Sequence, residues 1–270
     1  MSASSRRALP LAMVALACAT ACAPPRPVAL PELGTVTQRY RVAESARERL
    51  AAGLRGDLLV WARMRGEALP GVSGRLLIRA PDGLHVIVDS AFGVAMELSA
   101  RAETLEAYVP SRRTGGRTVT DPAGLGVPPS MAAVRFLAGA WTPPGAAWDA
   151  ATRSDSGWVV RWAEHADSLR LVVDGDGRPR MIEWRPALGD TLCVRYVSFV
   201  PLGGSSWPDR TEWSEARWGM SARVRLERLR PEAPPANERL RIRSSLAGPE
   251  TLEEYADFER WWSELMRGDP

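Results

Sequence analysis

Apolar and polar residues alternate with a period of two over much of this chain, and this pattern limits the fold more than any other feature. Five segments in the first half show it: 58–64, 76–78, 84–88, 94–98 and 105–109. Successive side chains of a β-strand point to opposite faces of a sheet, so each segment predicts a strand with one buried face. Turn-forming residues separate the segments, as in Pro81-Asp82-Gly83 and in residues 111–117. We therefore expect an antiparallel meander of five strands.

A second series of alternating segments follows a stretch of different character. Prolines and glycines flank residues 130–141, and one face of this stretch carries apolar side chains at helical spacing: Met131, Val134, Leu137, Ala138 and Trp141. Seven further strands are predicted around residues 158–162, 169–173, 182–184, 192–196, 211–213, 224–226 and 240–242. Asp174-Gly175-Asp176-Gly177 is typical of a hairpin turn. The chain therefore predicts a mainly β fold of the α+β class, with a central helix at about 130–141.

Two more helices are predicted at the ends of the folded region. Val42, Ala46 and Leu50 have helical spacing, and Gly53 would close a helix over residues 42–54. Residues 249–270 combine capping-box spacing with an apolar stripe of Leu252, Tyr255, Phe258, Trp262 and Leu265. We expect this C-terminal helix to pack on the sheet. Binding to a membrane or a partner is the alternative.

The first 21 residues predict a secretory signal peptide. Arg6-Arg7 precede an apolar run from Ala8 to Ala17, which is too short to span a membrane as a mature helix. The next residues, Ala19-Thr20-Ala21-Cys22, resemble the lipobox of bacterial lipoproteins, in which the cysteine is acylated after cleavage. We therefore predict an exported protein anchored to a membrane through a lipid on Cys22.

Residues 22–33 are predicted to join this anchor to the folded domain as a tether. Their run Pro24-Pro25-Arg26-Pro27 favours an extended chain. Alanine rather than aspartate after Cys22 implies sorting to the outer membrane, with the domain facing the periplasm. Two alternatives stay open, namely cleavage without lipidation and the use of Cys18.

Charge and cysteine content exclude several classes of function. Removal of the signal peptide takes away Arg6 and Arg7, which lowers the formal net charge from +3 to +1. The remaining arginines are interleaved with acidic residues, so nucleic acid is not an expected partner. Cys193 is the only cysteine after Cys22, and the chain has 2 histidines. We therefore expect no internal disulfide, no cysteine-based zinc site and no cofactor.

The chain also lacks the spacing that catalytic motifs need. Gly203-Gly204-Ser205-Ser206 does not have the pattern of a hydrolase elbow. Glu164-His165 and Asp167-Ser168 supply the residue types of a catalytic triad only as neighbours in sequence. Asp174-Gly175-Asp176-Gly177 begins like a calcium loop, yet Arg185 stands where that loop requires glutamate. The sequence therefore predicts a protein that is not an enzyme.

The first half of the mature chain carries a further pattern. It runs from Leu54-Arg55-Gly56 through residues 76–84 (LLIRAPDGL) to Phe92-Gly93 and Tyr108-Val109-Pro110. Together with the order of lipobox, tether, helix and two strand series, it resembles the LolA/LolB superfamily of periplasmic lipoprotein carriers, most closely the lipid-anchored LolB-like branch. The resemblance implies a single antiparallel, unclosed β-barrel wrapped around helices over residues 34–248.

The resemblance also implies an apolar cavity that takes acyl chains on the inner face of this half-barrel. Apolarity selects the candidate lining residues on the strands: Val60, Leu76, Ile78, Val86, Val88, Met96, Leu98, Leu105, Val109, Trp158, Val160, Leu171 and Trp184. The central helix adds Val134 and Leu137. LolB proteins also carry a protruding apolar residue on a loop between early strands, for which Leu69 is the candidate counterpart.

Three kinds of partner follow from this interpretation. They are the acyl chains of lipoproteins or phospholipid, the membrane that holds the anchor, and a periplasmic carrier protein. The alternative is a structural or assembly subunit of a cell-envelope machine, in which the protein's own side chains fill the cavity.

Overall fold

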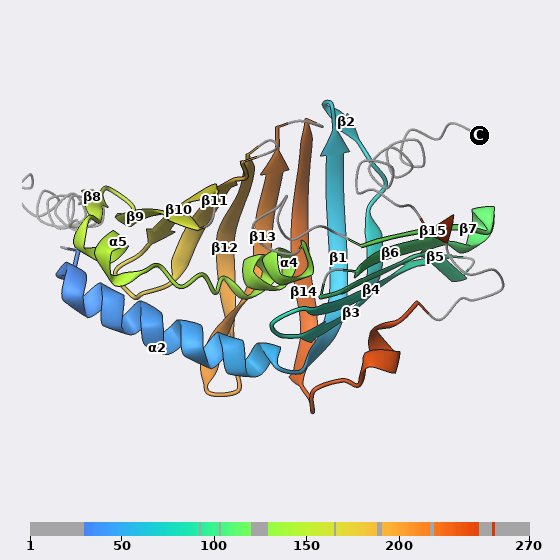
Figure 1. Ribbon diagram of the computed structural model, residues 1–270, viewed down its shortest axis with the longest axis horizontal. Helices are drawn as coiled ribbons and strands as arrows, with labels where there is room; N and C mark the ends of the chain where they lie inside the picture. Colours follow the sequence, from blue (N-terminus) through green and yellow to red (C-terminus); the bar gives the residue numbers. More distant parts are fainter. Residues whose placement is uncertain are drawn as a thin grey trace, which may run out of the picture. The chain divides into compact units, whose positions relative to one another are not determined.

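A single sheet of fifteen strands dominates the computed structural model (Figure 1). The structure describes residues 30–91, 93–102, 104–119, 129–164, 166–187, 191–216, 219–242 and 250–251. The predicted signal peptide, Cys22, the tether up to residue 29 and the predicted helix over residues 249–270, apart from residues 250–251, lie outside the described residues.

The sheet consists of two meanders. The first contains β1 (Leu54–Met64), β2 (Glu67–Ala68), β3 (Val72–Arg79), β4 (Gly83–Ser90), β5 (Gly93–Arg101), β6 (Thr104–Val109) and β7 (Thr114–Val119). The second contains β8 (Thr152–Ser154), β9 (Gly157–Glu164), β10 (Asp167–Val173), β11 (Pro179–Arg185), β12 (Leu192–Leu202), β13 (Ser205–Glu215) and β14 (Met220–Pro231). Antiparallel pairing of β1 with β14 joins them.

The sheet is antiparallel and unclosed. Its order is β15-β7-β6-β5-β4-β3-β1-β14-β13-β12-β11-β10-β9-β8, with β2 beside β1. The short β15 (Glu250–Thr251) is the exception, because it pairs with β7 in parallel. Among the described strands β8 and β15 stand at opposite ends of this order and do not pair with each other. The predicted fold class, a mainly β half-barrel with few helices, is therefore confirmed.

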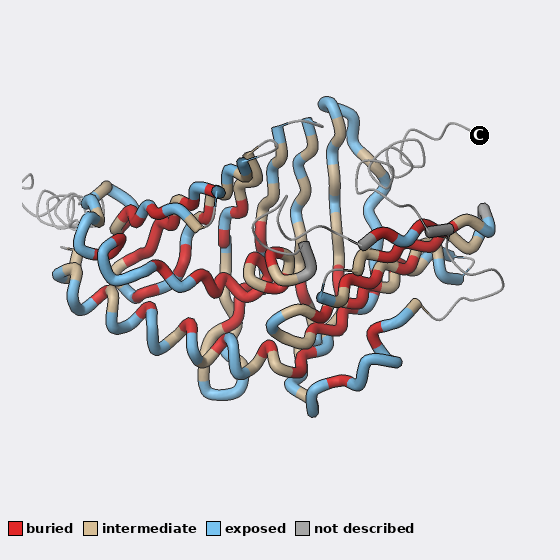
Figure 2. The backbone as a smooth tube through the Cα atoms, in the orientation of Figure 1, coloured by how far each residue is buried: buried red, intermediate tan, exposed pale blue. Residues whose placement is uncertain are grey.

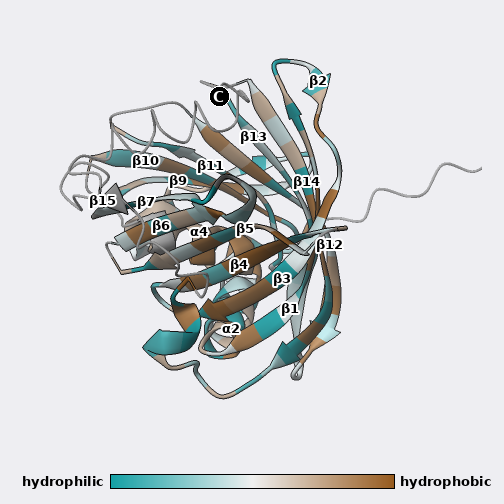
Figure 3. Ribbon diagram, turned by 90° about the vertical axis from the view of Figure 1, so that its right-hand side faces the viewer, coloured by the Kyte–Doolittle hydropathy of each residue, from teal (hydrophilic) through white to brown (hydrophobic). Residues whose placement is uncertain are grey.

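Among the described residues, three α-helices lie on one face of the sheet, which we call the inner face. They are α2 (Leu33–Ala51), α4 (Pro129–Ala138) and α5 (Gly145–Asp149). The sheet curves around α2 and α4 (Figure 3). Two 3₁₀ turns, η1 (Pro110–Arg112) and η2 (Asn237–Leu240), complete the described elements. No helix in the described part of the chain has both the length and the apolar character needed to cross a membrane.

The predicted helix over residues 42–54 is wrong in its bounds and its buried face. The helix begins at Leu33, within the predicted tether, and Val42 is 66% exposed. Its buried side instead carries Val36, Tyr40, Glu44, Arg47 and Ala51. Two of these residues are charged. The apolar spacing in the sequence therefore predicted a different side of the helix as the buried one.

Gly53 follows the end of this helix, and its N–H donates to the Leu50 carbonyl oxygen over 3.3 Å, but its φ is not positive as in a left-handed glycine cap. A Cβ atom there would lie 2.3 Å from the Glu232 carbonyl oxygen, and the Glu232 N–H donates to the Gly53 carbonyl oxygen over 2.9 Å. Glycine at this position therefore lets the end of β14 approach the start of β1.

Two other local predictions are wrong. Residues 240–242 do not form a strand, because fully buried Leu240 ends η2 and anchors this segment against β4 and β5. Pro234-Pro235, just upstream, have no N–H groups for strand pairing. Residues 114–117, predicted as part of a break, belong to β7, where Gly115-Gly116 pair with β6.

The central helix ends earlier than predicted. It covers Pro129–Ala138, and Gly139 takes a positive φ of 60° that terminates it. Trp141, predicted on its apolar face, lies beyond the helix and is completely buried. The predicted hairpin turn at Asp174 is correct, since the Gly177 N–H donates to the Asp174 carbonyl oxygen between β10 and β11.

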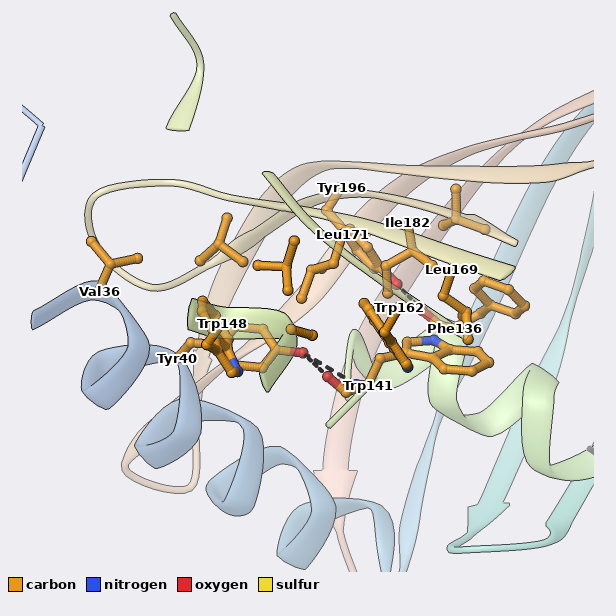
Figure 4. Packing of buried hydrophobic residues seen from close by; sticks show 14 of the residues in the cluster. Val36, Tyr40, Phe136, Trp141, Trp148, Trp162, Leu169, Leu171, Ile182 and Tyr196 are labelled. Carbon is orange, nitrogen blue, oxygen red and sulfur yellow. Dashed lines mark hydrogen bonds between the residues drawn. The ribbon is translucent and has the colours of Figure 1, made fainter. Parts of the chain in front are cut away.

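Two clusters of buried side chains lie between the helices and the sheet. Figure 2 shows in red which residues of the strands and helices are buried. The aromatic cluster lies over β9–β12: Val36, Tyr40, Ala132, Phe136, Trp141, Ala147, Trp148, Val160, Trp162, Leu169, Leu171, Val173, Ile182, Val194 and Tyr196 (Figure 4). The aliphatic cluster lies over β1, β3, β4, β13 and β14: Ala51, Leu54, Leu58, Leu76, Ile78, Val86, Val88, Val134, Leu137, Ala138, Ala140, Trp207 and Leu226. Trp213 packs against both clusters.

Truncation of Phe136 tests whether α4 holds the aromatic cluster together. Its ring centroid lies 5.0, 6.0 and 5.8 Å from those of Trp141, Trp184 and Trp213. Phe136→Ala should lower the free energy of unfolding by about 3–5 kcal/mol in urea titrations, because it leaves a cavity among these rings. Val42→Ala, on the exposed side of α2, should change it by less than about 0.5 kcal/mol. A small loss for Phe136→Ala would contradict this packing.

Candidate functional site

The inner face of the sheet is the candidate functional site. Strand pairing places all thirteen strand residues chosen from the sequence on this one face. Val86, for example, pairs with Leu76 on one side and Leu98 on the other. Across the seam between the meanders, Val60 pairs with Val224. The inner face is therefore apolar over both meanders.

These residues differ in how deeply they are buried. Ile78, Val160 and Leu171 are completely buried, and Leu76, Val86 and Val88 are nearly so. The remaining seven are half-buried: Val60, Met96, Leu98, Leu105, Val109, Trp158 and Trp184. Those on β5 and β6 are at the end of the sheet opposite the aromatic cluster.

Helix α4 separates the two clusters. Ala132 and Phe136 pack into the aromatic cluster, whereas Val134, Leu137 and Ala138 pack into the aliphatic cluster. The helix contacts β4, β5, β6 and β13 as well as α2. The two candidate lining residues of this helix, Val134 and Leu137, therefore fill space that an acyl chain on the inner face would need.

Two clefts lie away from this interior. One, of about 560 Å³, is lined mainly by side chains of the outer face, including Trp61, Cys193 and Arg195. Leu69 also lines it and is half-buried in the loop after β2. A second cleft, of about 510 Å³, lies between α2 and α5. The inner face itself is covered by the helices and the two clusters.

Polar contacts hold the end of α4 and the following loop in place. The Tyr40 hydroxyl donates to the Trp141 carbonyl oxygen over 2.6 Å (Figure 4). The Tyr196 hydroxyl donates to the Phe136 carbonyl oxygen over 2.7 Å. Arg47 donates from Nη2 to the Gly139 carbonyl oxygen over 3.1 Å. Each contact gives a hydrogen bond to a backbone carbonyl group at the end of α4 or in the loop that follows it.

A buried acid and base on α2 form part of this arrangement. Arg47 is completely buried, and its Nε and Nη1 atoms have no hydrogen-bond partner among the described residues. Glu44 Oε1 lies 3.2 Å from the Tyr40 hydroxyl oxygen. Burial raises the pKa of Glu44 to about 7, with the charge of Glu48 as a second cause. Burial also lowers the pKa of Arg47 and raises that of Tyr40.

Sequence reasoning missed this polar group. Tyr40, Glu44 and Arg47 lie at helical spacing, which is the signal that could have found them. The prediction used only apolar positions for the buried side of the helix. Tyr196 was recognised as a strand residue, but its bond to the Phe136 carbonyl depends on how α4 packs.

The raised pKa of Glu44 predicts a pH dependence of stability. Its carboxyl group takes up a proton more readily in the folded protein than in the unfolded chain, where its pKa is near 4.5. The contribution of Glu44 to stability is therefore fully present below about pH 4.5 and is lost as the pH rises through 7, by up to about 3 kcal/mol. Glu44→Gln should remove this fall in urea titrations at pH 5 and pH 8. An unchanged pH dependence in that variant would exclude Glu44 as its source.

Two solved structures show where this fold occurs. The LolA superfamily protein NE2245 from Nitrosomonas europaea matches with a TM-score of 0.53 and 13% identity, over 73% of this chain and 94% of that one. A DUF1329 family protein from Desulfovibrio piger matches with a TM-score of 0.51 and 10% identity, over 76% and 97%. No protein-family model and no curated protein sequence matches the chain. The similarity bears on the fold, and it confirms that this chain has a LolA/LolB-like fold.

Proposed function

We propose that this protein binds acyl chains of lipoproteins or lipids between α4 and the inner face of its half-barrel. The observation that carries the proposal is the continuous apolar inner face of an unclosed sheet, covered by a helix rather than by a second sheet. In this proposal the protein carries or holds lipid and is not an enzyme. The thirteen strand residues, with Val134 and Leu137, line the site.

The free energies involved are of the right size for reversible binding. An acyl chain that buries about 14 methylene groups gains roughly 11 kcal/mol at about 0.8 kcal/mol each. To admit it, α4 must move and expose Val134, Phe136 and Leu137, which costs about 1.5–3 kcal/mol for each side chain. The acyl chain would replace the contacts that α4 loses, so the gain exceeds the cost by a few kcal/mol. A carrier needs such a balance, because it must also release its cargo.

The polar contacts at the end of α4 oppose this movement. The bonds from Tyr40, Arg47 and Tyr196 hold residues 136–141 to α2 and β12. Exposure of Phe136 and Leu137 displaces the carbonyl groups that accept these bonds, so we infer that the bonds break when an acyl chain enters and re-form when it leaves.

The location of the protein is a second part of the proposal. A lipid on Cys22 would anchor the chain in the outer membrane, and residues 23–32 would hold the half-barrel in the periplasm. A periplasmic carrier protein is then the expected donor of lipoprotein cargo. Cys18 remains the alternative lipidation site.

A structural or assembly subunit of an envelope machine is the second candidate function. The filled interior favours it, since both clusters consist of the protein's own side chains. In that case the inner face serves stability alone, and the surface of the sheet contacts the partner.

Lipid binding can be tested with a matched pair of variants on one strand. Native mass spectrometry of the mature chain with Cys22→Ala, purified without detergent, should show a bound lipid mass. Leu98→Glu should reduce uptake of a fluorescent fatty acid at least about tenfold, because the ligand would bury a charge. Val94→Glu, 37% exposed on the same strand β5, should leave uptake unchanged. A lipid-free protein that takes up no fatty acid would favour the assembly subunit.

The anchor predicts where the protein is found in the cell. Cys22→Ser should move it from the membrane fraction to the soluble periplasmic fraction, because no acyl chain remains to hold it. Cys18→Ser provides the control and should leave the protein in the membrane fraction. If only Cys18→Ser releases the protein, the anchor lies on Cys18, and release by neither variant would rule out a cysteine-linked lipid.

A further inference from the structure

A third cleft, separate from the two described above, lies on the outer face of the sheet. The proposed function does not use it. It has a volume of about 360 Å³ and opens on β1, β3, β4 and β14. Its charged side chains come from four separate parts of the chain: Arg55, Asp57, Arg75, Arg228, Arg230 and Arg239. Leu77 and Ile87 form an apolar part of its lining. We call it the arginine cleft.

One wall of this cleft is a segment that crosses the outer face after β14. This strap, residues 232–242, is held at several points. The His85 Nδ1–H donates to the Arg239 carbonyl oxygen over 3.0 Å, and His85 Nε2 lies 2.8 Å from Glu97 Oε1. The Ser99 hydroxyl donates to the carbonyl oxygen of Leu240. The wall that carries Arg239 is therefore attached to β4 and β5.

A β-bulge adds an arginine to the cleft. Between the pairs Arg55–Arg230 and Asp57–Glu227, β14 has one more residue than β1. The bulge places Arg228 at a positive φ of 49°, an unusual conformation for a residue with a side chain. Its guanidinium group contacts the Asp57 carboxylate on the outer face. The bulge therefore concentrates positive charge at this position on the strand.

The positive charge in the cleft exceeds the negative charge around it. Arg55 Nε lies 3.6 Å from Glu232 Oε2, and Arg239 Nη1 lies 2.9 Å from Oε1 of the same carboxylate. Arg75 Nη2 lies 3.0 Å from Asp89 Oδ1. With the contact between Arg228 and Asp57, five arginines face three carboxylates. Arg230 has no ion-pair partner within the described residues. An anion is therefore the kind of ligand that this cleft lacks.

We propose that the arginine cleft binds a phosphate group. Guanidinium groups bind phosphate oxygens through two parallel hydrogen bonds, and a phosphate group has the charge opposite to that of the clustered arginines. The cleft is too small for an extended polyanion but accommodates one headgroup. The phosphate comes either from a lipid headgroup in the membrane or from a soluble phosphate ester. Because this site lies on the outer face, it does not depend on acyl-chain binding to the inner face.

Two double variants test the site in the mature chain with Cys22→Ala. Arg75→Gln with Arg230→Gln removes two cleft arginines, neither of which holds a buried carboxylate. Arg153→Gln with Arg161→Gln removes the same charge from exposed positions on β8 and β9. The probes are vesicles of phosphatidylcholine with and without phosphatidylglycerol, and inorganic phosphate in calorimetry. Equal thermal unfolding midpoints confirm that both double variants fold.

The expected result is binding to vesicles that contain phosphatidylglycerol. The cleft variant should lose about thirtyfold in affinity and the control less than about threefold. Asp89→Asn, which frees Arg75, should raise the affinity by about threefold. Binding of inorganic phosphate alone, lost in the cleft variant, would identify a soluble phosphate ester as the source. The proposal fails if neither probe binds, if both double variants lose affinity equally, or if Asp89→Asn weakens binding.

Discussion

The antiparallel pairing of β1 with β14 is the interaction on which the rest of this structure depends. Without it the chain would form two separate meanders. The pairing matches Val60 with Val224 and Ala62 with Ala222, so the inner faces of the two meanders join in phase. A slip by one residue would turn one inner face outward. The arginine cleft opens on both strands of this seam, and the candidate acyl-chain site extends over the two meanders that the seam joins.

The helices complete the core with a combination of apolar and polar contacts. The contacts made by α4 on the two clusters are apolar and can be replaced by another apolar group such as an acyl chain. The bonds that Tyr40, Arg47 and Tyr196 make to the end of α4 are directional and buried. A buried arginine with unpartnered N–H groups costs stability rather than adding to it. We infer that this polar group specifies the position of α4, whereas the apolar clusters supply the free energy.

The sheet separates two kinds of chemistry by the alternation of its side chains. Along β1, Val60 and Ala62 face inward and Trp61 and Arg63 face outward. Charged residues on the outer face form ion pairs between neighbouring strands, such as that of Arg170 with Glu183. Surface pairs of this kind contribute little to stability, typically about 0–1 kcal/mol. The outer face is therefore free to vary for binding, while the inner face must remain apolar for the protein to fold.

Much of this architecture could be predicted from local patterns. The period-two alternation located eleven of the fifteen described strands to within a few residues, because a strand with one buried face must alternate wherever it lies. Apolarity also chose inner-face residues that the pairing brings together. The prediction failed where burial does not follow apolarity, as on α2 with Glu44 and Arg47. It also failed where one buried residue, Leu240, anchors an irregular segment.

The sequence by itself determined the strands, their inner residues and the order of the elements, since these follow from the preferences of neighbouring residues. Only the tertiary structure decided that α4 fills the interior and that five arginines converge on the outer face. Those arginines come from β1, β3, β14 and the strap, so no spacing in the sequence relates them. Their proximity results from long-range strand pairing and from a bulge, and hydrogen bonds between distant segments position the strap. Contacts of this kind depend on the whole fold, which local preferences do not specify.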